Sequence, residues 1–195
     1  MPIVLPDPPA EGAELIQRHV PYLLAARRIT DVFDGADKHF QVAPPQPIYT
    51  TTAQDFLDHK ALEAAQPIGW QYVIFVDDSV FASAEISDKE DGEWMFTVLR
   101  FQAYTRPIAD ALHSAEELPE IATADYELRI LSSSSVSLRA VWLHGPTDVL
   151  IPIAQTPRGV DANIKYSEEA LTDALSKLAF QRTQGNRFDP AADLA

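Results

Sequence analysis

The sequence predicts an α+β fold, in which a mostly antiparallel sheet has its helices packed on one face and an N-terminal helical segment (residues 1–66) precedes it. Two observations lead to this prediction. Segments in which apolar and polar residues alternate, as in half-buried strands, follow one another in groups of three. After each group, apolar residues recur at helical spacing, so the order β-β-β-α occurs in residues 67–120 and again in 121–184. Residues 185–195 are expected to be a flexible tail.

The first 66 residues are expected to form an arm and helices that pack on the duplicated domain. Four prolines among the first ten residues favour an extended arm. A helix is predicted over residues 13–31, with a kink at Pro21. The proline-rich stretch that follows is expected to be irregular, with a short strand at 47–50. Thr52 with Asp55 three residues later resembles a capping box, which predicts the start of a second helix.

In the first block, strands are predicted over residues 70–76, 80–86 and 94–101, separated by turns rich in Asp, Ser and Gly. A helix is predicted next, with Pro107 near its first position and Pro119 at its end.

The clearest strand pattern lies in residues 125–153. Alternation predicts one buried face, made by Leu128, Ile130, Leu138, Ala140 and Trp142. A three-residue loop at 133–135 keeps these residues on one face, and it places Arg129 opposite Arg139. A third strand over 149–153 completes the second block before a helix that starts after Ser167.

The amino-acid composition limits the partners and the chemistry that the protein can use. The chain carries 15 basic and 29 acidic side chains, a net charge of -14. Such a surface repels nucleic acid and anionic membranes and attracts a basic partner, although acidity can also serve solubility alone. The absence of cysteine excludes disulfides and thiolate chemistry. Since we find neither a signal-peptide pattern nor an apolar run of about 20 residues, we expect a cytoplasmic protein that does not enter membranes.

The motifs of several common enzyme classes are missing. The seven glycines are all far apart in the sequence, so the paired glycines of the dinucleotide-binding motif, the P-loop and the GxSxG elbow are not present. The five histidines include no pair at the spacing of the HExxH zinc motif. We therefore expect no cofactor and no metal, and we assign no catalytic residue.

Four residues are candidates for binding a ligand or partner: Arg129, Arg139, Trp142 and His144. Two guanidinium groups on one exposed face can grip a carboxylate or phosphate, unless Glu127 and other acids neutralise them. His144 with Asp148 across a turn resembles a general-base pair, but no nucleophile is identifiable beside it. The alternative is that Trp142 belongs to the core and that His144 ends a strand.

Two functions from different classes follow. The interpretation that we favour is a non-enzymatic interaction protein, such as an adaptor, chaperone or inhibitor, whose acidic surface binds a basic protein partner. A sheet with helices on one face leaves the other face for that partner or for a homodimer. The alternative is an enzyme or small-ligand-binding protein with a pocket between sheet and helices. Fold alone does not choose between them.

Overall fold

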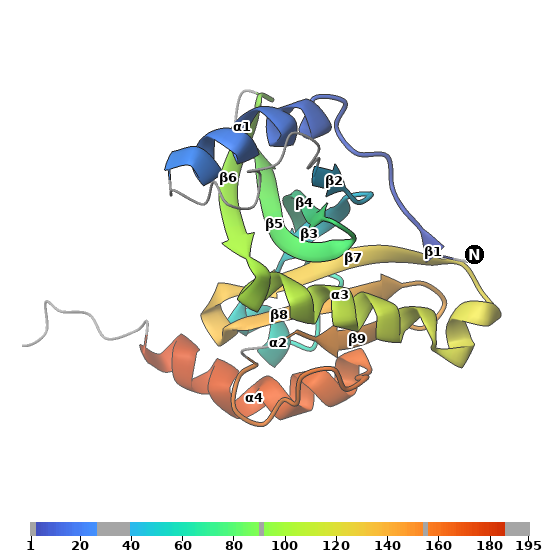
Figure 1. Ribbon diagram of the computed structural model, residues 1–195. Helices are drawn as coiled ribbons and strands as arrows, with labels where there is room; N and C mark the ends of the chain where they lie inside the picture. Colours follow the sequence, from blue (N-terminus) through green and yellow to red (C-terminus); the bar gives the residue numbers. More distant parts are fainter. Residues whose placement is uncertain (1–2, 27–39, 90–91, 154–155, 186–195) are drawn as a thin grey trace, which may run out of the picture.

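The computed structural model describes residues 3–26, 40–89, 92–153 and 156–185 (Figure 1). These residues form a mixed α+β structure with a large, mostly antiparallel sheet and four α-helices. The helices are α1 (Gly12–Ala26), α2 (Ala53–Leu57), α3 (Gln102–Glu116) and α4 (Glu168–Gly185). The strands are β1 (Ile3–Val4), β2 (Phe40–Val42), β3 (Gln46–Thr50), β4 (Gln66–Val76), β5 (Ser79–Asp88), β6 (Trp94–Phe101), β7 (Tyr126–Ser133), β8 (Leu138–His144) and β9 (Val149–Pro152). In the described part of the chain, no helix is long and apolar enough to cross a membrane.

One sheet joins both predicted blocks, in the order β6-β5-β4-β3-β7-β8-β9. The strand at the centre is β3, which pairs antiparallel with β4 and parallel with β7. The short β1 also pairs with β7 in parallel, beyond the end of β3, and β2 pairs with β4. Three strands and a helix follow each other twice along the chain, as β4–β6 with α3 and β7–β9 with α4. That this order reflects a duplication stays a prediction.

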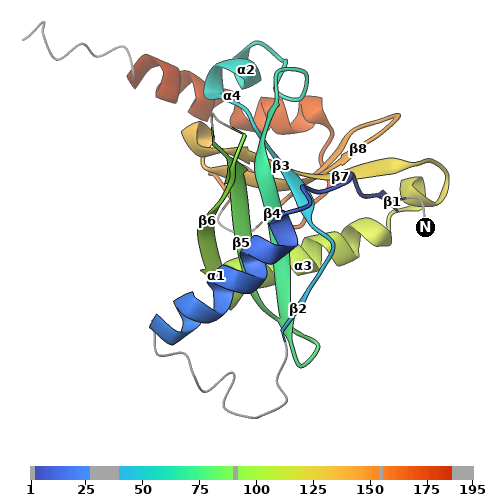
Figure 2. The same cartoon turned by 90° about the horizontal axis from the view of Figure 1, so that it is seen from above.

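The expectation that the helices pack on one face of the sheet is wrong. Helix α3 covers one face through Ile108 and Ala111, which pack with Val73 and Val141. On the opposite face, α1 covers the β4–β6 half, while α2 and α4 cover the β7–β9 half. Figures 1 and 2 show α1 and α4 at opposite ends of the sheet, with α3 between them on the other side. The reason is that consecutive residues of β8 are apolar and buried, so this half of the sheet needs cover on both faces.

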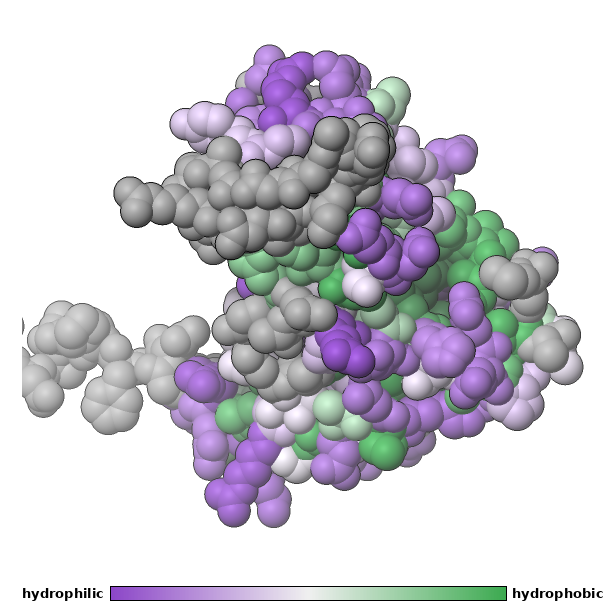
Figure 3. All heavy atoms as spheres, in the orientation of Figure 1, coloured by the Kyte–Doolittle hydropathy of each residue, from purple (hydrophilic) through white to green (hydrophobic). Residues whose placement is uncertain are grey.

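Among the described residues, some apolar side chains on the α3 side are only partly covered. Figure 3 views this side and shows apolar side chains gathered in a hollow between α3 and the strands above it. Partly buried residues at the edge of this core include Ile3, Phe75 and Val80.

The predicted register of the hairpin β7–β8 is also wrong. Arg129 lies opposite Trp142, and Arg139 lies opposite Ser132, so the two arginines are not cross-strand neighbours. The loop is longer than predicted: a 3-10 turn at Ser134–Val136 is followed by Ser137 with a φ of 55°. Val136 is fully buried in the core beneath α4, which holds the loop in this longer form. Leu128 and Ile130 consequently face α3, whereas the apolar even-numbered residues of β8 face α2 and α4.

Several local predictions are confirmed. The capping box at α2 is present, because Thr52 Oγ1 accepts from the backbone N–H of Asp55 and an Asp55 carboxylate oxygen accepts from the backbone N–H of Thr52. The predicted first helix is present as α1, with Pro21 inside it, and its last predicted residues (27–31) lie outside the described part. Most of the predicted tail, 186–195, also lies outside it.

Candidate functional site

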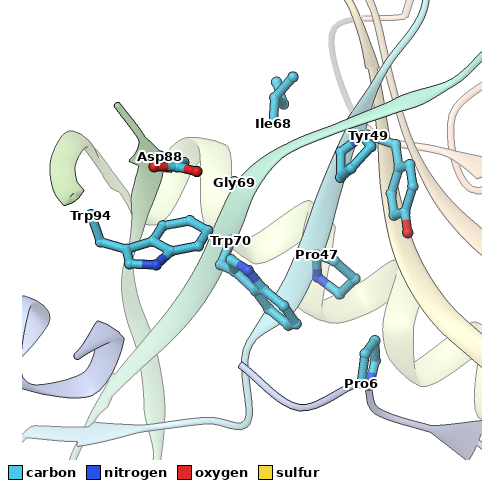
Figure 4. A pocket seen from close by; sticks show the side chains of 9 residues that line it. Pro6, Pro47, Tyr49, Ile68, Gly69, Trp70, Asp88 and Trp94 are labelled. Atoms are coloured by element: carbon cyan, nitrogen blue, oxygen red, sulfur yellow. The ribbon is translucent and has the colours of Figure 1, made fainter. Parts of the chain in front are cut away.

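The elements that the structure describes leave the middle of the sheet open on the face opposite α3. Between the ends covered by α1 and by α2 with α4 lies a cavity of about 520 Å³, which we call the aromatic pocket (Figure 4). It is lined by Pro6, Pro47, Tyr49, Pro67, Ile68, Gly69, Trp70, Asp88 and Trp94. Its walls come from the N-terminal arm and from β3, β4, β5 and β6, so the pocket exists only once these strands are assembled.

A β-bulge shapes the wall of the pocket. Ile48 pairs with Gly69 but the next residue, Tyr49, pairs with Pro67, so Ile68 is an extra residue in β4. Ile68 is 46% exposed although it is large and apolar. Gly69 is required here because a Cβ would lie 2.1 Å from the backbone oxygen of Ile86 on β5. The bulge therefore exposes an apolar side chain at the rim while keeping β4 and β5 in close contact.

Two indole rings and one carboxylate form one side of the pocket. Trp70 comes from β4, Trp94 from β6 and Asp88 from the end of β5, and Trp94 and Asp88 are paired across the strands. Figure 4 shows the two indoles beside each other with Asp88 next to them, and the rings of Pro6 and Pro47 on the other side. Both tryptophans are half-buried and Asp88 is exposed. The arrangement offers apolar ring surface with a negative charge at its rim.

Further carboxylates continue the acidic rim. Trp94 also lines a second recess, together with Glu11, Glu14, Leu15, Arg18, Gly92 and Glu93. The linings of the two recesses contain four carboxylates and one cationic side chain. Arg18 pairs with Glu14, and Lys89 beside the recess pairs with Glu93 at 3.3 Å. Counted over the described residues, the rim keeps a net negative charge after these pairings.

Tyr49 connects the aromatic pocket to the residues that the sequence singled out. Its ring packs edge-on against Trp142, with 5.4 Å between centroids. The guanidinium carbon of Arg129 lies 4.6 Å from the centre of the Tyr49 ring and 4.7 Å from that of Trp142. The Nε of Arg129 also donates to Glu127 at 2.7 Å. Arg129 is thus held between two aromatic rings and a carboxylate.

Asp148 organises the outer end of this group. One of its oxygens, Oδ1, accepts from the Nε1 of Trp142 at 2.9 Å and lies 2.8 Å from the Nδ1 of His144. Trp142 is 2% exposed, so its N–H depends on this acceptor. The His144 side chain is 45% exposed and its ring meets that of Trp142 edge-on. The predicted pairing of His144 with Asp148 is present, and the same carboxylate also anchors the core tryptophan.

The structure brings together three of the four candidate residues. Arg129, Trp142 and His144 lie on the face of the sheet opposite α3 and form one group with Tyr49 and Asp148, in which Trp142 is buried. Arg139 faces the other side, where it pairs with Glu85 at 2.9 Å. In the described residues, no group of three or more His, Asp or Glu side chains could hold a metal ion. Whether any of the four residues binds a ligand stays a prediction.

Sequence reasoning missed the aromatic pocket. It assigned Trp70 and Trp94 to strands, and it treated the acidic residues near Gly92 as a solvated turn. The local signal that was present is the run Pro67-Ile68-Gly69-Trp70, since proline and glycine inside a strand mark a bulge.

Comparison of the chain with models of known protein families, with curated proteins and with solved structures gives no match. We therefore infer function from the chemistry of the site itself.

Proposed function

We propose that the chain is a non-enzymatic interaction protein and that its aromatic pocket binds a basic, extended segment of a partner protein. The observation that carries this proposal is the combination of two half-buried indoles that line a pocket and an acidic rim beside them. A Lys or Arg side chain over an indole gains about 0.5–1 kcal/mol at an exposed site and about 2 kcal/mol or more when it is desolvated. Asp88 at the rim adds an opposite charge for the same cation.

The shape of the open face favours a segment of chain over a compact ligand. Trp94 lines both the pocket and the acidic recess, and Tyr49 extends the pocket lining toward Arg129, whose guanidinium it contacts. These contacts make one continuous surface that crosses several strands. Trp, Tyr and Arg are the residue types most enriched among the hot spots that supply most of the binding energy in protein–protein interfaces.

Long-range electrostatics favour the same class of partner. The net charge of -14 raises the rate at which basic proteins meet this chain and opposes the approach of nucleic acid.

We retain three expectations from the sequence as part of this proposal. They are a cytoplasmic location, a duplication of the strand-and-helix order, and a second copy of the chain as an alternative occupant of the face opposite α3.

The alternative function, a small-ligand or enzymatic site, is favoured by one observation. The pocket volume of about 520 Å³ lies in the range of about 300–1,000 Å³ that small-molecule sites occupy. A small apolar cation would fill it through the same indoles and Asp88. If the pocket is a small-ligand site, a single free amino acid should bind as tightly as a peptide, and this distinguishes it from a site for a partner protein.

The test is fluorescence anisotropy with a labelled lysine- and proline-rich peptide of nine residues, at constant ionic strength. We expect Asp88→Asn to weaken binding about three- to tenfold, the loss of one cation contact. Asp173→Asn, on the exposed surface of α4, removes the same charge far from the pocket and is the matched control. Trp94→Ala should weaken binding further, and its neighbour Met95→Ala should not.

Equal effects of the two Asp variants would reduce the interaction to diffuse attraction and refute the pocket as the site. Binding of free lysine as tight as that of the peptide would favour the small-ligand function. Analytical ultracentrifugation of the chain without peptide measures its oligomeric state. A dimer that is lost in the Trp94→Ala variant would identify a second copy of the chain as the occupant.

A further inference from the structure

Arg139 takes part in a second cluster of charged residues, on the face opposite the aromatic pocket. It projects from β8, yet it reaches Glu85 on β5, although β4, β3 and β7 lie between these strands in the sheet. The sheet therefore curls toward α3 on this face. Arg100 of β6 reaches the same Glu85. The sequence predicted that Arg139 would pair with Arg129. In the structure, the arginine beside Arg139 is Arg100.

Both guanidinium groups converge on one carboxylate oxygen. The Nη2 of Arg139 lies 2.9 Å from Glu85 Oε1, and the Nε of Arg100 lies 3.2 Å from the same oxygen. Nη2 of Arg139 also donates to the side-chain oxygen of Gln71. Within the part of the chain that the structure describes, the cluster thus holds two positive charges against one negative charge.

One donor of this cluster is left over. The Nε of Arg139 is buried and has no hydrogen-bond partner within the described part of the chain. Buried donors without an acceptor are rare in folded proteins, and a missing ion or ligand is one established reason for them. Burial, together with the charge of Arg100 and against the opposing effect of Glu85, lowers the pKa of Arg139. An additional anion would relieve both the excess positive charge and the unpaired donor.

Buried amides hold Arg139 in place. Gln71 is fully buried, and its side-chain nitrogen donates to Gln46 at 3.4 Å. Gln46 in turn donates to the backbone oxygen of Pro44. This chain of amides fixes the oxygen of Gln71 toward Arg139, so the guanidinium is oriented before any ligand arrives.

We propose that Arg100 and Arg139 bind an oxyanion, the carboxylate or phosphoryl group of a ligand, on the α3 face. The Arg100 side chain is 39% exposed and gives access from solvent, while the Arg139 side chain is 20% exposed. A guanidinium pair suits this class of ligand because its N–H groups match the geometry of carboxylate and phosphate oxygens. The site lies on the other face from the aromatic pocket and does not depend on the function proposed for it.

The test uses inorganic phosphate and acetate as probes, each titrated at 0.15 M total ionic strength so that screening is constant. The readout is the NMR signal of the Arg139 Nε–H group in the full chain. We expect a saturable shift of that signal, with one of the two probes binding more tightly and so identifying the phosphoryl or carboxylate source. Arg100→Gln should weaken binding about tenfold or more, the effect of losing a charge-assisted hydrogen bond.

Arg182→Gln is the matched control, because Arg182 is exposed on α4 and its loss changes the net charge equally. It should leave the affinity unchanged. Arg100→Lys keeps the positive charge but loses the planar guanidinium group. Its affinity for the probe should therefore lie between that of Arg100→Gln and that of the unsubstituted chain. No saturable shift with either probe, or the same affinity in Arg100→Gln as in the unsubstituted chain, would overturn the proposal.

Discussion

Replacing Asp148 by alanine should destabilise the chain through Trp142 rather than through His144. The substitution removes the acceptor of the Trp142 Nε1–H group, which is 2.9 Å away and belongs to a side chain only 2% exposed. A buried donor left without its acceptor costs about 1–3 kcal/mol. The ion pair with His144 joins side chains that are 45% and 26% exposed, and such a pair contributes about 0–1 kcal/mol.

The expected loss for Asp148→Ala is therefore about 2 kcal/mol, most of it from the tryptophan. For a domain of this size, that lowers Tm by about 4–8 °C. His144→Ala should cost less than about 1 kcal/mol and lower Tm by less than about 4 °C. Asp148→Asn keeps an oxygen acceptor and should lie between the two.

Urea unfolding of a double-mutant cycle checks the cause. In a Trp142→Phe background there is no indole N–H to satisfy, so Asp148→Ala should lose most of its effect, with a coupling of about 1–2 kcal/mol. Additive effects of the two substitutions would refute the reasoning. So would a loss in His144→Ala as large as that in Asp148→Ala, because the histidine contact would then be the stabilising one.

Two further predictions concern single groups. Burial raises the pKa of Tyr72 to about 12, so its stabilising contribution is complete below the unfolded pKa of about 10 and is lost as the pH rises through about 12. Tyr72→Phe should remove that part of the pH dependence, measured by chemical denaturation between pH 9 and 12, and an unchanged slope would contradict it. Thr52→Ala breaks the capping box of α2 and should cost about 1 kcal/mol, whereas Thr52→Ser, which keeps the accepting oxygen, should cost less; equal losses in the same assay would show that the cap bond does not matter.

The local elements of the fold were predictable from the sequence. Strands β3 to β9 and the capping box at Thr52 depend mainly on neighbouring residues, so local patterns identify them. The short strands β1 and β2 were not predicted, and the β7–β8 loop was predicted too short. The pairing of His144 with Asp148 was predictable for the same reason, since a short turn brings both side chains together.

The hairpin register and the sides on which helices pack were not predictable in this way. The period-two pattern identifies alternate residues, but it does not say which face of one strand matches which face of the next. Here the longer loop, with Val136 buried beneath α4, puts Ile130 and Trp142 on opposite faces. Apolar residues on both faces of β8 then require helices on both sides.

By itself, the sequence determined an acidic, cysteine-free α+β chain and the local identity of most of its elements. Only the tertiary structure decided which distant residues meet. The position of β3 beside β4 places Pro47 in the same pocket lining as Trp70, and the curl of the sheet brings Arg139 to Glu85 and Arg100. Both candidate sites combine side chains from strands far apart in the sequence, and such contacts depend on strand order and sheet curvature, which no local pattern encodes.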